Sequence, residues 1–195
     1  MIVSQRFVWG HVPKTGGDAT ATMIARVPRL VLLADHLGDH AKHLSFDDRR
    51  GSIKGKLLVA NIRRLPDWAI SVEHLRAYGG IWPDFEPLGP QPAHVVASRD
   101  DADRALAMVV GDYEVDRWLR QEHLTDDLLD FLRKIATLTA AEERAIRSVG
   151  LVNVHRPRFR RWRRRSSKRF FTPAQIDELY ANNPRWAAIE RRVYG

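Results

Sequence analysis

The feature that most constrains the fold is a short apolar segment near the N-terminus that runs into a glycine-containing loop. Residues 7–12 (Phe-Val-Trp-Gly-His-Val) have the composition of a buried strand, and a proline and the pair Gly16-Gly17 follow them. Residues 19–27 then have the composition of a helix. A tight loop between a strand and a helix aims backbone N–H groups and the positive end of the helix dipole at one point. We therefore predict that this loop binds a phosphate or sulfate group, to which Lys14 adds a full positive charge.

Further apolar runs indicate the sheet to which this strand belongs. Residues 29–34 and 56–62 are near-continuous apolar runs, separated by segments of helical composition, and residues 94–98 are a possible fourth strand. This pattern predicts an α/β fold: a three-layer sandwich whose central, mostly parallel sheet has helices on its faces. Ligands of such sheets bind at the carboxyl ends of the strands. The loop at Lys14 and the segments after Leu33 and Ile62 are therefore expected at one edge of the sheet.

Length and composition narrow the class of protein. A chain of 195 residues is long enough for one sizeable core, so we predict a single domain over residues 1–195. Without cysteine it has neither a disulfide framework nor a cysteine metal site. No apolar run reaches membrane-spanning length, and the N-terminus does not have the pattern of a signal peptide. We therefore expect a cytoplasmic protein with no membrane partner; no pattern indicates an oligomeric state.

The net charge of +8 comes from one segment. Residues 156–169 hold nine Lys or Arg and no acid, whereas the remaining 181 residues carry a net charge of −1. Aromatic residues such as Phe159 and Trp162 are interleaved with this charge, a combination that can bind single-stranded nucleic acid. Because the charge is local, it does not favour nucleic acid as the partner of the whole domain.

The loop sequence Pro13-Lys14-Thr15-Gly16-Gly17 resembles the 5′-phosphosulfate loop of the sulfotransferases that use 3′-phosphoadenosine-5′-phosphosulfate (PAPS). It is most similar to the carbohydrate-type branch, whose usual form is His-Ile-Pro-Lys-Thr-Gly-Gly. It does not match a Walker A loop, because the lysine precedes the glycine pair and no Gly-Lys-Ser/Thr follows. The resemblance implies a P-loop-like fold in which the donor is bound by Lys14, Thr15, Gly16, Gly17, Asp18 and Ala19.

Asp18 departs from the family, which has Thr or Ser at this position. A carboxylate beside a phosphate is repulsive. Two interpretations stay open: Asp18 points away from the donor as a helix cap, or it weakens donor binding.

A second motif follows the third predicted strand. This segment resembles the family's 3′-phosphate motif, in which an arginine at a strand end and a hydroxyl on the next helix bind one phosphate. The matching residues are Arg63, a turn that contains Pro66, and Ser71. Pro66 lies one place later than in the family, so an alignment on the proline makes Arg64 the ligand instead. Exposed arginines that merely end a strand are the alternative.

A histidine-rich segment lies between these motifs. His43-Leu44-Ser45-Phe46 resembles the short family motif that contains the catalytic histidine, which implies that His43 is the general base. His36 and His40, with two nearby aspartates, could instead form a metal cluster with His43, but the spacing fits no metal signature. The resemblance implies that no metal is needed.

The C-terminal half extends the resemblance. Residues 117–123 form a strand if the likeness to the carbohydrate-type branch holds; otherwise they begin an amphipathic helix for which Thr125 is a plausible N-cap. The resemblance places Ser167 and Lys168 in a basic loop that closes over the adenosine phosphate. Thr172 is expected to cap a helix over residues 173–182.

Taken together, the resemblance implies transfer of a sulfuryl group from PAPS to a hydroxyl or amine of a carbohydrate or small metabolite. Lys14 would stabilise the charge that builds up on the leaving 5′-phosphate. Two other functions stay open. One is a nucleotide-dependent kinase-like P-loop enzyme, which should need Mg²⁺ and an acidic ligand after a strand. The other is a nucleic-acid-binding module that uses residues 156–169.

Overall fold

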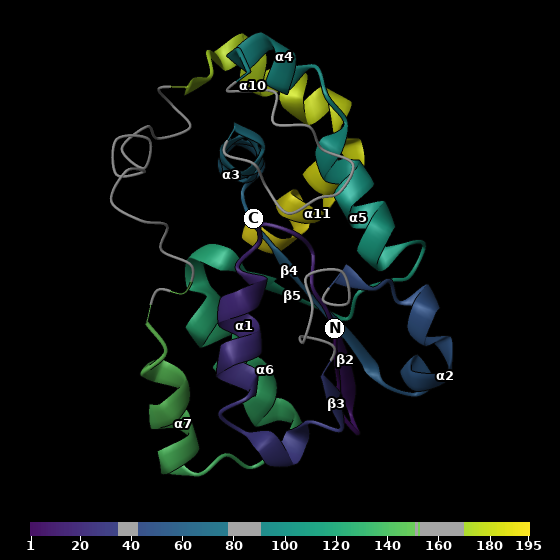
Figure 1. The fold of residues 1–195 in the computed structure, drawn as a ribbon, viewed down its shortest axis with the longest axis vertical. Helices are drawn as coiled ribbons and strands as arrows, with labels where there is room; N and C mark the ends of the chain where they lie inside the picture. Colours follow the sequence, from purple (N-terminus) through teal and green to yellow (C-terminus); the bar gives the residue numbers. More distant parts are fainter. Residues whose placement is uncertain (35–42, 78–90, 151, 153–169) are drawn as a thin grey trace. The chain divides into compact units, whose positions relative to one another are not determined.

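The structure is a computed structural model that describes residues 1–34, 43–77, 91–150, 152 and 170–195. The chain divides into two compact units (Figure 1). The first unit comprises Met1–Ile62 and Leu106–Val154, and the second comprises Arg63–Ala105 and His155–Gly195. The prediction of a single domain over residues 1–195 stays a prediction.

The first unit is built on a five-stranded sheet in the order β3-β1-β2-β4-β5. Its strands are β1 (Ile2–Val3), β2 (Phe7–Gly10), β3 (Leu33–Ala34), β4 (Leu57–Ile62) and β5 (Arg117–Arg120). The central strands β2, β4 and β5 pair in parallel, whereas β1 pairs antiparallel with both β2 and β3. This confirms the predicted α/β fold with a mostly parallel sheet. It also confirms that residues 117–120 are a strand rather than the start of a helix.

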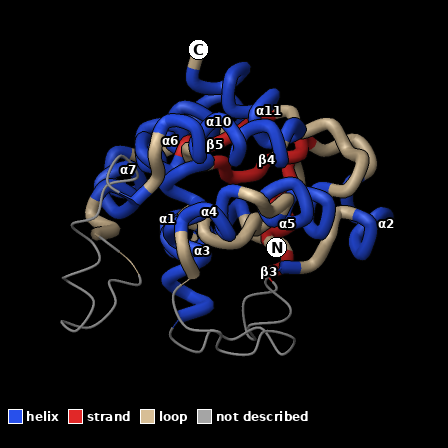
Figure 2. The backbone as a smooth tube through the Cα atoms, turned by 90° about the horizontal axis from the view of Figure 1, so that it is seen from above, coloured by secondary structure: helices blue, strands red, loops and turns tan. Residues whose placement is uncertain are grey.

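The first unit has the helices α1 (Gly17–Ile24), α2 (Arg50–Ile53), α6 (Leu124–Ile135) and α7 (Ala140–Arg147), drawn in blue in Figure 2, with short 3-10 turns η1 (Pro28–Leu30), η3 (Asp47–Arg49) and η4 (Gln121–His123). Buried residues of α1, α6 and α7 pack against one face of the sheet in a single core. Phe7 and Trp9, two positions apart on β2, point to the same side and pack in one core with Met23 of α1 and Leu128 of α6. All four residues of β2 are buried, as expected for a central strand covered on both faces.

The second unit is helical in the part that the structure describes. Its helices are α3 (Leu65–Ala77), α4 (Ala93–Ala97), α10 (Pro173–Asn182), α11 (Pro184–Tyr194) and the first half of α5 (Asp101–Val110), which continues into the first unit. The prediction of a strand at residues 94–98 is wrong. A five-residue apolar run cannot be assigned to strand or helix by its pattern alone. Here Val96 and Ala97 are buried on the inner side of α4, and the side-chain amide of Asn182 donates a hydrogen bond to the Ala97 carbonyl.

Two predicted helix starts have different outcomes. Thr172 caps α10 as predicted, since its hydroxyl accepts a hydrogen bond from the Gln175 N–H and the Gln175 side chain accepts from the Thr172 N–H. Thr125 does not cap α6, because the helix begins one residue earlier and His123 occupies the N-cap position without a side-chain cap. The preceding 3-10 turn carries the chain directly from β5 into the helix.

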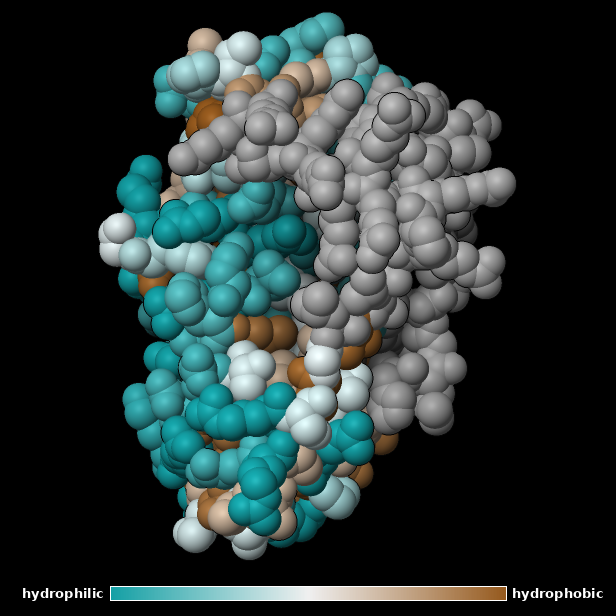
Figure 3. Space-filling view, turned by 90° about the vertical axis from the view of Figure 1, so that its left-hand side faces the viewer, coloured by the Kyte–Doolittle hydropathy of each residue, from teal (hydrophilic) through white to brown (hydrophobic). Residues whose placement is uncertain are grey.

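Few large hydrophobic side chains are exposed in the described residues. The face in Figure 3 is largely hydrophilic, with hydrophobic areas that are small and scattered. Among the described residues the exposed large hydrophobic side chains are Leu32, Leu33 and Leu57. No helix in the described part of the chain is both long and apolar enough to cross a membrane.

Candidate anion-binding site

The predicted phosphate loop has the backbone shape of an anion-binding nest. Lys14 has φ 62° and Gly16 has φ 89°, whereas Thr15 between them has a negative φ. Successive residues of opposite handedness turn their N–H groups into one concavity, which is a site for an anion. Helix α1 begins directly after this turn, so its positive dipole end faces the same place. Gly16 is its N-cap residue, and no side chain caps the helix.

Lys14 holds a backbone conformation that is costly outside glycine. It is the one non-glycine residue with a positive φ in the described ranges. Such a conformation costs on the order of 1–3 kcal/mol and persists where surrounding contacts fix it. The contacts here come from Thr15, which is fully buried and whose hydroxyl donates to the Val12 carbonyl at 2.7 Å. The Thr15 side chain therefore stabilises the loop from inside, which leaves its backbone as the part that can reach a ligand.

Asn61 on β4 holds the same loop from the neighbouring strand. Its Nδ2 donates to the Thr15 carbonyl at 3.1 Å and to Thr20 Oγ1 at 2.7 Å, and its Oδ1 accepts from Trp9 Nε1 at 2.8 Å. Asn61 has no exposed surface. Sequence reasoning missed this residue. The available signal was a lone amide inside the apolar run Leu57–Ile62.

The His43 side chain lies against His11, where the chain enters the anion loop. Its Nδ1 is 2.9 Å from the His11 carbonyl oxygen, and the two rings are 4.5 Å apart at 52°. A carbonyl can only accept a hydrogen bond, so Nδ1 carries the proton and Nε2 is the basic nitrogen of the neutral ring. The structure thus brings the predicted base to the predicted anion loop within the first unit.

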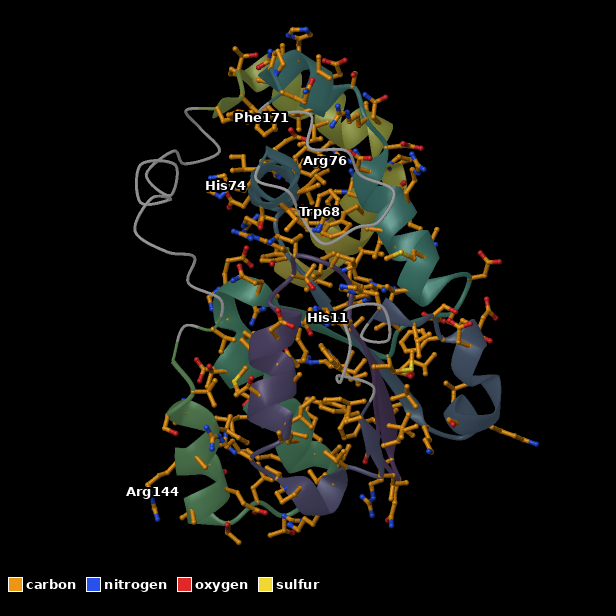
Figure 4. The ribbon with its side chains drawn as sticks, in the orientation of Figure 1. His11, Trp68, His74, Arg76, Arg144 and Phe171 are labelled. Carbon is orange, nitrogen blue, oxygen red and sulfur yellow. The ribbon has the colours of Figure 1, made fainter. Side chains whose placement is uncertain are left out.

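His11 is a second imidazole that sequence reasoning did not single out. It is 5% exposed and lies where β2 runs into the loop (Figure 4). Its ring packs between Trp9, at 5.3 Å, and His43. A Cβ added at Gly17 would fall 2.0 Å from His11 Cδ2 and Nε2, so the ring lies directly against the first residue of α1. The signal in the sequence was its place in His-Val-Pro-Lys-Thr-Gly-Gly, where the family form also begins with histidine.

The other loop positions follow from the start of α1. Asp18 and Ala19 are the second and third residues of the helix, both half-buried. Asp18 is not the N-cap, because Gly16 occupies that position. Its carboxylate lies in the first turn, where a negative charge interacts favourably with the helix dipole.

Arg63 and Ser71 belong to the second unit, on either side of the start of α3. The Arg63 carbonyl accepts a hydrogen bond from Trp186 Nε1 at 2.9 Å, and Ser71 is half-buried in the second turn of α3. Pro66 is the second residue of the helix, a position whose N–H has no intrahelical partner, so the expected turn is the first turn of α3.

Arg64 faces the C-terminal helix. Its guanidinium lies 4.4 Å from the centroid of the Tyr194 ring, and its Nη1 is 3.6 Å from Glu190 Oε1. The same carboxylate accepts from the Leu65 N–H and from Tyr180 Oη. Burial, followed by the nearby Glu190 charge and this hydrogen bond, raises the pKa of Tyr180. Arg64 is therefore part of a packed cluster at the start of α3.

Four predicted residues lie outside the described residues: Ser167 and Lys168 of the basic loop, and His36 and His40 of the possible metal cluster. Within the described ranges, no three His, Asp or Glu side chains gather in a way that could hold a metal ion.

Comparisons with known proteins agree with this architecture. No family model matches the chain, and no curated protein matches it by sequence. A solved structure that matches is the crystal structure of mouse sulfotransferase SULT7A1 complexed with PAP, with a TM-score of 0.57 over 95% of this chain and 87% of that chain. The fold is that of a sulfotransferase. Because the two sequences are 18% identical, the likeness establishes the fold alone.

Proposed function

We propose that this protein is a PAPS-dependent sulfotransferase that sulfates a hydroxyl or amine of a carbohydrate or small metabolite in the cytoplasm. The observation that carries the proposal is the nest at Lys14 and Gly16, which opens at the start of α1 and has a tautomerically fixed histidine beside it. The fold shared with a PAP-complexed sulfotransferase supports the choice of anion.

In this proposal the donor is bound by its two phosphates. Lys14 and the backbone N–H groups from Thr15 to Ala19 bind the 5′-phosphosulfate, and Arg63 and Ser71 bind the 3′-phosphate. Arg63 is the proposed ligand, and Arg64, which contacts Glu190 and Tyr194, is the alternative. Ser167 and Lys168 are proposed to cover the bound nucleotide.

Transfer requires one proton acceptor and a stabilised leaving group. His43 Nε2 removes the proton of the acceptor as the acceptor oxygen or nitrogen attacks sulfur, and the bond between sulfur and the 5′-phosphate oxygen breaks. Adenosine 3′,5′-bisphosphate leaves with the bonding electrons, and Lys14 with the loop N–H groups stabilises the added charge. The proposal includes no metal.

In this proposal the Asp18 carboxylate lowers the affinity of the loop for the donor. Its carboxylate and the donor phosphate both interact with the N-terminal end of α1, so they compete for the same favourable potential. Asp18→Thr, which restores the residue type of the family, is expected to bind adenosine 3′,5′-bisphosphate more tightly.

Ligand-induced thermal stabilisation separates this function from the alternatives. We expect adenosine 3′,5′-bisphosphate to raise the unfolding temperature without Mg²⁺, and Lys14→Ala to reduce that shift. A shift only with ATP and Mg²⁺ would indicate the kinase-like enzyme, and a salt-sensitive shift only with an oligonucleotide would indicate the nucleic-acid-binding module. Either result would overturn the proposal.

Turnover tests the role of His43. General-base assistance is worth about 10² to 10⁴ in rate, and it acts on the acceptor rather than on the donor. His43→Ala should therefore lose most of the turnover with an acceptor found by screening, yet bind adenosine 3′,5′-bisphosphate nearly as the wild type does. The matched controls are His94→Ala and His123→Ala, two histidines outside the loop, which should keep turnover. Normal turnover of His43→Ala would remove it from the mechanism.

A further inference from the structure

We infer that Asn61 is a positioning residue that aims the Gly16 N–H of the loop at the bound anion, an inference that rests on the proposed function. Asn61 is fully buried and contacts three elements: β2 through Trp9, the loop through Thr15, and α1 through Thr20. It does not itself reach the ligand. It acts on the anion through the peptide group that joins Thr15 and Gly16.

The orientation of the Asn61 amide is fixed by its partners. The Trp9 indole N–H can only donate, so the atom that faces it is Oδ1, and the Thr15 carbonyl can only accept, so the atom that faces it is Nδ2. A flipped amide would place donor against donor and acceptor against acceptor. Three of the four hydrogen bonds that an asparagine amide can make are therefore committed, all of them inside the protein.

The direction of the Gly16 N–H follows from this geometry. No peptide bond in the described residues is cis, so the Thr15 carbonyl and the Gly16 N–H point in opposite directions from one plane. Asn61 holds the carbonyl toward the interior, and the N–H consequently points away from it. Gly16 has φ 89°, and a Cβ there would lie 3.0 Å from Gln121 Cγ and 3.9 Å from Asn61 Nδ2, so side chains pack closely against the loop backbone.

This arrangement makes the loop rigid before the anion arrives. A peptide that could rotate would have to be ordered on binding, and that cost would lower the affinity. Removing the Asn61 donor leaves the Thr15 carbonyl in a buried site without that hydrogen bond, which favours rotation of the plane toward solvent. The anion would then face a carbonyl where it had faced an N–H.

Asn61→Asp is the substitution that tests this. It keeps the size of the side chain and an acceptor for Trp9, but it replaces the donor to Thr15 by an oxygen. We expect adenosine 3′,5′-bisphosphate to bind about tenfold more weakly, which corresponds to the loss of one hydrogen bond to a charged group. In spectra of ¹⁵N-labelled protein, the Gly16 amide signal should move on titration of the wild type and should stay in place on titration of the variant.

Asn183→Asp is the matched control. Asn183 is 1% exposed, lies in the second unit, and makes a comparable set of buried hydrogen bonds to the backbone of α5 and its own helix end. It should lose as much stability as Asn61→Asp while keeping the Gly16 response to the bisphosphate. Asn61→Ala removes the same donor without adding a carboxylate, so a loss of affinity in both variants comes from the lost donor and not from repulsion between the new carboxylate and the anion. It also gives the comparison if Asn61→Asp does not fold.

The outcomes separate the inference from the function. A folded Asn61 variant that binds the bisphosphate within about twofold of wild type, with the Gly16 signal still responding, overturns the role of Asn61 and leaves the proposed function intact. If the wild type does not bind the bisphosphate but inorganic sulfate moves its Gly16 signal in an Asn61-dependent way, the sulfotransferase function fails and the positioning role stands. If neither ligand moves that signal in the wild type, both are wrong.

Discussion

Gly17→Ala gives a direct test of how the loop is packed. Gly17 is the first residue of α1 and does not have a positive φ, so its backbone conformation is open to alanine. Helix propensity alone would then stabilise the variant by about 0.5–1 kcal/mol. The added methyl group, however, would lie 2.0 Å from two ring atoms of His11 and 2.6 Å from a third. Either the His11 ring or the start of α1 must therefore shift.

The size of the penalty follows from what surrounds His11. The ring is 5% exposed and is held between the rings of Trp9 and His43, so it cannot move into solvent without breaking both contacts. Inserting a methyl group into such a site costs about 1–3 kcal/mol. This exceeds the gain from helix propensity, so we expect a net loss of about 1–2 kcal/mol in the free energy of unfolding.

Gly51→Ala is the matched substitution with the opposite expected sign. Gly51 is the second residue of α2, is exposed, and has nothing within 4 Å of an added Cβ. It should gain up to about 1 kcal/mol. For a chain of this length a difference of about 2 kcal/mol between the two variants corresponds to roughly 4–8 °C in the midpoint of thermal unfolding, followed by circular dichroism.

A double-mutant cycle identifies the cause. If the His11 ring produces the penalty, Gly17→Ala in the background of His11→Ala should cost at least about 1 kcal/mol less than in the wild type. Equal stabilisation by Gly17→Ala and Gly51→Ala would show that the ring does not lie against the helix start, and the account of the loop would be wrong.

Three further predictions concern the parts that support the site. Arg64→Ala should lower stability by about 0.5–1 kcal/mol through its lost contacts to α11, with bisphosphate affinity in calorimetry unchanged; a large loss of affinity would make Arg64 the 3′-phosphate ligand. Burial raises the pKa of the Asp127 carboxyl, but the hydrogen bonds from Arg120 outweigh it and the net pKa is lowered. The ionised Asp127 carboxylate therefore stabilises the protein above the unfolded pKa of about 3.9, and this stabilisation is lost as the pH falls through the lower folded pKa. Wild type and Asp127→Asn should differ in unfolding midpoint at pH 7 and converge near pH 2. A difference that stays constant with pH would contradict this. Thr139→Ala should cost about 1 kcal/mol in urea unfolding, because it removes the capping box with Glu142 at the start of α7; no change would show that the box contributes nothing.

The elements that sequence reasoning found are those whose pattern is local. The strand at Phe7, the loop at Gly16 and the helix after Gly17 follow from apolar runs and glycines that lie next to one another. The helix over residues 173–182 follows from a cap whose two partners are three positions apart. Signals of this kind need no knowledge of the rest of the fold.

The elements that it missed are fixed by distant partners. β1 consists of two residues and is a strand only because it pairs with β2 and β3 on either side. Asn61 has no local pattern, since its hydrogen-bond partners lie 41 to 52 positions away. His11 lies in the site because it contacts Gly17 and His43, and His43 lies 32 positions further along the chain. These contacts exist only once the sheet has formed.

The second unit is assembled from two separate stretches of chain, and this bears on the order of events during synthesis. The Arg63 carbonyl and the Leu65 N–H are bound by side chains of Trp186 and Glu190, which follow 123 and 125 positions later. Until α11 has left the ribosome, these two peptide groups lack the side-chain partners that hold them in the folded protein. The first unit, whose stretches end before residue 155, contains its own sheet and can form earlier. A nascent chain would therefore acquire its anion loop before the arginine that follows β4 is held in place, so a truncation that removes α11 should leave the sheet folded and the start of α3 frayed.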